Sequence, residues 1–180
     1  MANQILGGGG EGRLFLNLRE AHGWTYGAYS SVRSGKYTSK FKSTASVRNT
    51  VTDSAVVEFM NEIHKIRTES VKEDELKLAK AKFVGNFVME TQKPGTIASF
   101  ALRTQTQNLP ADFYENYIKN INAVTVQDVQ NAAKKYFDNI EDDDTLKNPY
   151  LLIEELREDF RRLMTITTDR ESRVWLQSLL

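Results

Sequence analysis

The sequence predicts an α+β fold from three features: an antiparallel hairpin over residues 25–47, a short helix before it and four or five helices after it. The hairpin region is rich in Tyr, Ser, Thr and Val, which favour strands, and Ser34-Gly35-Lys36 is typical of a turn. The later segments repeat apolar residues at helical spacing. With 180 residues, the chain can form one domain, or one domain and an appendage.

The composition excludes several classes of function. The 24 basic and 24 acidic residues cancel, so no overall field favours nucleic acid or an anionic membrane. The chain has no cysteine, which excludes disulfides, thiolate nucleophiles and thiolate metal sites. No apolar run approaches the roughly 20 residues that span a bilayer, and the start lacks the features of a signal peptide. We therefore expect a soluble protein of unknown compartment, and the abrupt, helix-like start suggests an internal fragment with a Met placed before it.

The first helix is expected directly after a run of glycines. Its apolar residues share one face: Leu14, Phe15, Leu18 and Ala21. Gly23 is a typical C-terminal cap for this helix. In the hairpin that follows, the apolar residues partly alternate, as in a half-buried sheet: Tyr37, Phe41, Ala45 and Val47.

Two long helices are expected after the hairpin. The first covers residues 51–67, with Asn49 or Thr50 as its cap. Its apolar stripe consists of Val56, Phe59, Met60, Ile63 and Ile66. Ser70 and Glu73 have the spacing of a capping box, which predicts the second helix at 73–92. Its apolar face consists of Leu76, Ala79, Phe83, Val84 and Phe87.

Shorter segments complete the helical part of the chain. Lys93-Pro94-Gly95 breaks the long helix, and a further helix is expected at 96–106. Pro110 opens the next one, which continues to Ile121. Thr125 with Asp128 begins the last helix, which ends at Phe137. We expect residues 1–138 to form one domain, 139–149 an acidic linker, and 150–180 a helical tail with no assigned role.

The glycine run raises the question of a nucleotide site. Gly7, Gly9 and Gly12 satisfy G-x-G-x-x-G, and the run is close to a P-loop. A P-loop, however, needs Lys and Ser/Thr where this chain has Arg13 and Leu14. No strand precedes the run, as a dinucleotide fingerprint requires. We therefore expect a structural bend, and a nucleotide-binding module is the weakest of the functions considered.

The sequence by itself shows no catalytic or metal-binding machinery. Its two histidines, His22 and His64, belong to no H-x-x-E-H motif. His64 lies mid-helix beside charged residues, so we expect it on the surface.

Arg19 and Tyr26 form the most suggestive pair, because they flank the junction between the first helix and the hairpin. A guanidinium and a phenol are both hydrogen-bond donors, and together they could hold a carbonyl or carboxylate oxygen. The alternative is a surface ion pair of Arg19 with Glu20 or Glu11, and a Tyr26 buried in the sheet. Spacing alone favours this alternative.

At these residues the sequence resembles the pitrilysin/insulinase family of zinc metallopeptidases, which includes mitochondrial processing peptidase. The residues that carry the match are Leu6, Gly7, Gly8, Gly12, Arg13, Leu14, Phe15, Leu18, Arg19, Glu20, Gly23 and Tyr26. The segments EDELKLAKAKFVGNF and INAVTVQDVQNAAKKYF resemble later parts of the family pattern, so the resemblance extends from Asn3 to about Phe137.

The resemblance implies a partial processing-peptidase-like unit, in which helices cover one side of an antiparallel sheet. Such units pair into a clamshell, where one half carries H-x-x-E-H and zinc, and the other supplies an Arg and a Tyr to the substrate carbonyl. Arg19 and Tyr26 match that pair in type, order and spacing. The resemblance thus implies the C-terminal, non-zinc half, with no cofactor of its own, zinc in the partner half and inactivity when alone. It also implies a zinc-binding homologous half or subunit as partner, a peptide substrate and a dimer as one arrangement.

Two departures from the family pattern leave an alternative open. The early part of the unit, where H-x-x-E-H would lie, is missing, so the domain is expected to be truncated at its N-terminus. After Phe137 an acidic stretch stands where the family has a buried strand. Some members of the family are structural subunits without peptidase activity, and the alternative function is an inactive scaffold of the same fold.

Overall fold

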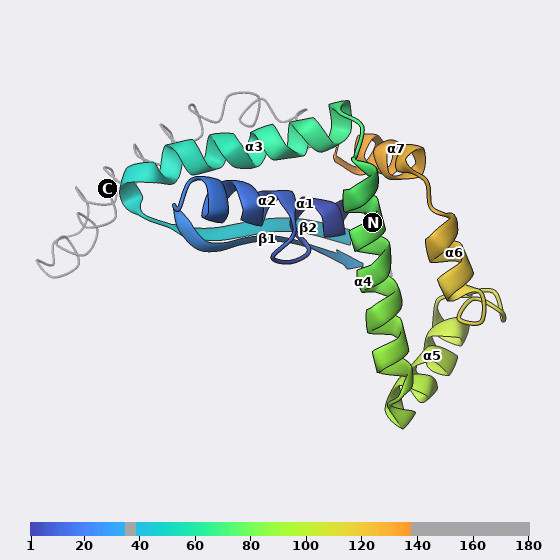
Figure 1. Cartoon of the computed structure of the whole chain (residues 1–180). Helices are drawn as coiled ribbons and strands as arrows, with labels where there is room; N and C mark the ends of the chain where they lie inside the picture. Colours follow the sequence, from blue (N-terminus) through green and yellow to red (C-terminus); the bar gives the residue numbers. More distant parts are fainter. Residues whose placement is uncertain (35–38, 138–180) are drawn as a thin grey trace, which may run out of the picture.

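The computed structural model describes residues 1–34 and 39–137 (Figure 1). The predicted linker at 139–149, the predicted tail at 150–180 and most of the predicted turn lie outside the described residues, as does Tyr37. The expected domain boundary at residue 138 therefore stays a prediction.

The described residues form a hairpin and a series of helices. The first half contains α1 (Ala2–Gly7), α2 (Arg13–Phe15), the π-helical segment η1 (Leu16–Ala21), β1 (Thr25–Ser34) and β2 (Ser39–Val47). The second half contains the 3-10 turn η2 (Asn49–Val51), α3 (Thr52–Thr68), α4 (Glu73–Thr91), α5 (Pro94–Thr106), α6 (Tyr117–Ala123) and α7 (Val126–Phe137). No helix among the described residues is long and apolar enough to cross a bilayer.

The hairpin and its helices form layers. β1 pairs antiparallel with β2, and α1, α2 and η1 lie against β1. α3 covers these short helices from the outside, so that they lie between α3 and the hairpin (Figure 1). α4, α5 and α6 extend away from the hairpin, and α7 returns to pack against α3 (Figure 1). The predicted fold class, helices on one side of an antiparallel sheet, is confirmed.

One apolar core joins these layers. Its most completely buried large side chains are Leu6, Leu14, Leu18, Ile66 and Val129. They come from α1, α2, η1, α3 and α7, so the core lies where the short helices meet the long ones. Burying one such side chain stabilises the fold by about 1.5–3 kcal/mol.

Most of the predicted elements are present, including the hairpin, the capping glycine and the last helix. Gly23 adopts a φ of 62°, and its amide donates to the carbonyl of Arg19 at 2.9 Å. At the start of α7, the amide of Thr125 donates to the Asp128 carboxylate at 2.8 Å, and the amide of Asp128 donates to the Thr125 hydroxyl at 3.1 Å. Both ends were expected from local sequence, because each depends only on residues close in the chain.

Several local predictions were wrong. α3 begins one residue later than expected, and Val51, not Asn49 or Thr50, occupies the capping position without a side-chain cap. α4 is capped by Glu75, which accepts from the amide of Lys72 at 2.9 Å, and not by the Ser70 box. Turns occupy residues 111–116, so the helix expected at Pro110 starts only at Tyr117. Ala21, the last residue of η1, is exposed and does not share the buried face of Leu14 and Leu18.

The glycine run forms a close backbone crossing. A Cβ on Gly7 would lie 2.7 Å from the backbone nitrogen of Ser30, and a Cβ on Gly12 would lie 2.8 Å from the Cα of Gly7. The amides of Gly8 and Gly12 donate to backbone carbonyls at 3.2 and 3.0 Å. The expected structural bend is thus a packed one, in which α1, α2 and β1 approach more closely than any side chain allows.

This crossing predicts a large stability effect at Gly7. Gly7→Ala should lower the free energy of unfolding by about 1–3 kcal/mol, because the added methyl group meets backbone atoms that have no room to move. Gly85→Ala is the matched control, since a Cβ there meets nothing within 4 Å, and alanine in mid-helix should stabilise by about 0.5–1 kcal/mol. Urea denaturation of both variants measures the difference. Equal stabilities would contradict the crossing.

Candidate functional site

Arg19 and Tyr26 lie side by side on the surface. The Cζ of Arg19 is 5.0 Å from the centroid of the Tyr26 ring and 4.8 Å from that of Phe15. The side chain of Arg19 is 39% exposed, and Tyr26 is 89% exposed. A cation over an aromatic face is stabilised by about 0.5–1 kcal/mol at an exposed site. The structure therefore brings the two predicted site residues together and leaves both accessible.

The alternative arrangement for these residues is present only in part. Arg19 does approach Glu20, with 3.6 Å between Nε and Oε1, but both side chains are well exposed and such pairs contribute little. Glu11 pairs with Lys82 instead, at 3.1 Å. Tyr26 is not buried in the sheet. The guanidinium is thus loosely paired and able to accept another partner.

The end of the helix determines where Arg19 stands. In η1 the amide of His22 donates to the carbonyl of Asn17 at 3.1 Å, a bond five residues long. Such π-helical turns are rare and occur often at functional sites. Gly23 then turns the chain through the left-handed region, so that β1 returns beside the last turn of the helix. As a result, Arg19 and Tyr26, which are seven residues apart in the sequence, are in direct contact.

A β-bulge determines where Tyr26 points. Thr25 pairs with Val47, but Ala28 pairs with Ala45, so two residues of β1 lie opposite one residue of β2. Side chains alternate in a regular strand, and Tyr26 would share the face of the buried residue Ala28. The extra residue reverses the alternation, and bulges are known to redirect side chains next to active sites.

Phe15 also belongs to this site, although the sequence indicated only an apolar helix position and a match to the family pattern for it. It is 8% exposed, it supports the guanidinium of Arg19, and its ring centroid is 5.9 Å from that of Tyr29. Phe15 precedes Arg19 by four residues, a spacing at which helical side chains meet. That spacing was a usable signal for its role under the guanidinium.

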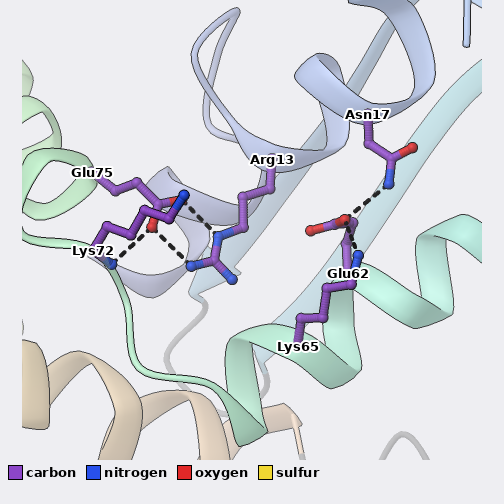
Figure 2. Close-up of polar contacts among 6 residues, drawn as sticks. All are labelled: Arg13, Asn17, Glu62, Lys65, Lys72 and Glu75. Atoms are coloured by element: carbon purple, nitrogen blue, oxygen red, sulfur yellow. Dashed lines mark hydrogen bonds and ion pairs between the residues drawn. The ribbon is translucent and has the colours of Figure 1, made fainter. Parts of the chain in front are cut away.

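α2 continues directly into η1, so Arg13 and Arg19 lie on one helix. The side chain of Arg13 connects this helix to α4. Its Nε and Nη2 donate to the two carboxylate oxygens of Glu75 at 2.8 and 2.9 Å, and Glu75 also caps α4 through the Lys72 amide (Figure 2). The hydrogen bond to Glu75 raises the pKa of Arg13. Partial burial alone would raise the pKa of Glu75, but the hydrogen bonds from Arg13 and Lys72 together lower it.

A second anchor connects the same helix to α3. The side-chain amide of Asn17 donates to the buried Glu62 at 2.9 Å (Figure 2). It also donates to Glu58 at 2.8 Å. Lys65 donates to the same oxygen of Glu62 at 3.0 Å (Figure 2). The buried carboxylate is therefore paired with a cation and accepts a second hydrogen bond. The helix that carries Arg19 is therefore held by hydrogen bonds to both α3 and α4.

The described residues do not fit a zinc site. No group of three His, Cys, Asp or Glu side chains that could hold a metal occurs in the part of the chain that the structure describes. His22 stacks on Trp24, with 4.0 Å between ring centroids, and His64 is exposed on α3, as expected.

Residues 1–83 match the family model described as the peptidase M16 inactive domain. The resemblance to the pitrilysin/insulinase family is confirmed. The M16 match includes both Arg19 and Tyr26. No match was found among the curated proteins.

Solved structures share the M16 fold. A peptidase M16 inactive domain from Pseudomonas fluorescens is 26% identical with a TM-score of 0.69, and the match covers 74% of this chain and 32% of that one. A conserved protein from Enterococcus faecalis V583 is 23% identical, with a TM-score of 0.67 and coverages of 74% and 31%. A zinc protease described as putative from Bordetella pertussis Tohama I is 15% identical, with a TM-score of 0.62 and coverages of 76% and 74%. The chain thus spans about a third of the length of the first two proteins.

The anchor between Arg13 and Glu75 predicts a pH dependence of stability. A carboxyl whose pKa is lowered on folding stabilises the protein above its unfolded pKa, here about 4.5, and the contribution is lost as the pH falls through the folded pKa. Glu75→Gln should therefore cost about 2–3 kcal/mol at pH 7, and the difference from wild type should shrink below pH 4.5.

Glu73→Gln, an exposed change in the same first turn of α4, is the control and should stay within about 1 kcal/mol at all pH values. Denaturant unfolding from pH 7 to pH 3 measures all three chains. A difference between Glu75→Gln and wild type that does not vary with pH would contradict the lowered pKa.

Proposed function

We propose that this chain is the non-zinc half of a pitrilysin-type zinc metallopeptidase, which binds extended peptide and completes the active site of a zinc-bearing partner half. The observation that carries the proposal is the exposed contact between Arg19 and Tyr26, residues that match the family pair in type and spacing. Because the chain spans a third of its longer relatives, the partner half would lie in further sequence or in another subunit.

The two side chains would act as hydrogen-bond donors to the oxygen of the scissile peptide. Arg19 offers several N–H groups in a fixed plane, and Tyr26 offers one O–H beside them. Negative charge develops on that oxygen as the tetrahedral intermediate forms, and donors already in position stabilise it. The contact with Phe15 limits the motion of the guanidinium, so little order remains to be imposed when substrate binds. The zinc of the partner half would polarise the same carbonyl.

The peptide itself would bind as an added strand. The sheet of the described residues has two strands, β1 and β2, and no third strand of the described residues pairs with their outer edges. Extended peptides pair with such edges. Tyr26 stands at the start of β1, where a peptide that follows the sheet would pass the guanidinium of Arg19.

An inactive scaffold of the same fold is the second candidate. The glycine crossing and the Arg13–Glu75 anchor stabilise the fold, and a structural subunit would need both. Tyr26, by contrast, buries too little surface to stabilise the core, so folding does not explain its position. An H-x-x-E-H motif elsewhere in the same gene product, or in a neighbouring gene, would favour the peptidase.

The proposal predicts that both donors are needed for turnover. In the assembled peptidase, Arg19→Ala and Tyr26→Phe should each lower kcat by roughly 100-fold, the usual effect of removing one oxyanion donor. The zinc content should be unchanged, because neither residue is a metal ligand. Hydrolysis of a fluorogenic peptide and metal analysis of each variant measure the two quantities.

Arg33→Ala is the matched control, since Arg33 is an exposed arginine farther along the same strand, and its kcat should stay near the wild-type value. Wild-type kinetics in both Arg19→Ala and Tyr26→Phe would refute the proposed function and leave the scaffold.

A further inference from the structure

We infer that Thr25 is a positioning residue, whose hydroxyl holds the β-bulge that directs Tyr26 toward Arg19. The inference rests on the proposed function, because it explains how that site is assembled. Thr25 touches neither the guanidinium nor, in the proposed site, the substrate. It acts through the backbone of Tyr26 and Gly27.

The hydroxyl of Thr25 lies inside the bulge. The amide of Gly27 donates to it at 3.2 Å. Its oxygen is also 2.8 Å from the carbonyl of Ser46 and 2.9 Å from the carbonyl of Gly27, so its proton is donated to one of these two acceptors. One side chain thereby connects both strands at the point where two residues of β1 face a single residue of β2.

These contacts replace the ladder bonds that a bulge disrupts. A bulge leaves backbone groups unpaired, and each unpaired polar group shielded from water is costly. The Thr25 hydroxyl satisfies the amide of Gly27 and approaches the carbonyl of Ser46. Without this hydroxyl, the bulged pairing loses stability relative to a regular strand pairing. In the regular pairing, Tyr26 lies on the same face of the sheet as Ala28, a fully buried residue. Loss of one hydroxyl would therefore separate Tyr26 from Arg19.

The direct test is the contact between the two side chains in solution. The Tyr26 ring lies over the guanidinium, so it should shift the NMR signals of the Arg19 side-chain protons, and Tyr26→Leu defines the size of that shift. Thr25→Val, which keeps the shape and removes the hydroxyl, should abolish most of it. Thr25→Ser, which keeps the hydroxyl, should retain it. Thr44→Val removes a hydroxyl from an exposed position of β2 and should change nothing.

An unchanged Arg19 shift in folded Thr25→Val would overturn the inference. A measurement on the wild-type chain does not depend on the folding of any variant: the Gly27 amide should exchange slowly with solvent, because it donates to Thr25. Exchange of this amide at the rate of an unprotected one would also overturn the inference.

Kinetics of the assembled peptidase separate this inference from the proposed function. Thr25→Val should lower kcat about tenfold with little change in KM, since it displaces one donor and leaves peptide binding intact. Thr25→Ser should restore kcat. If Arg19→Ala has no effect on hydrolysis, the proposed function fails while the NMR result still decides whether Thr25 holds the bulge. If Arg19→Ala is impaired and Thr25→Val is not, only the positioning role fails.

Discussion

The backbone crossing of Gly7, Gly12 and Ser30 is the constraint on which the rest of this structure depends. Three chain segments meet there at distances that exclude any Cβ on the two glycines. The crossing fixes the start of α2 against β1, and the buried Leu14 and Leu18 then direct one face of that helix into the core. The glycines thus define the position of the helix that carries Arg19.

From that fixed start, two irregularities of the backbone assemble the site. The π-helical turn and the left-handed Gly23 bring the chain back beside Arg19, and the bulge in β1 turns Tyr26 outward. A regular helix followed by a regular strand would place the phenol on the core side. Departures from regular geometry concentrate at functional sites, where the surrounding packing keeps them in place. Here the hydrogen bonds from Arg13 to Glu75 and from Asn17 to Glu62 hold the helix in place.

Features that depend on neighbouring residues could be predicted from the sequence, and features that depend on pairing could not. The helix end at Gly23 and the Thr125–Asp128 cap are local, and both are present. The bulge depends on how many residues of β2 face β1, a count that no single strand contains. Glu75 caps α4 while it also binds Arg13, 62 residues away, and this tertiary contact outweighed the local signal at Ser70. Arg19 and Tyr26 were identified by resemblance, because spacing alone favoured a surface ion pair.

A comparison of two arginines on one helix explains why their roles differ. The side chain of Arg13 is 14% exposed and donates to both carboxylate oxygens of Glu75. Removing Arg13 would therefore leave the partly buried charge of Glu75 unpaired. The side chain of Arg19 is much more exposed, and its Nε is 3.6 Å from the carboxylate of Glu20. Its guanidinium lies against the rings of Phe15 and Tyr26. An exposed pair of this length contributes at most about 1 kcal/mol, less than a charge-assisted hydrogen bond to a developing oxyanion can offer. Under the proposed function, an incoming carbonyl would displace Glu20 from Arg19, whereas displacement of Glu75 from Arg13 would loosen the helix that carries Arg19.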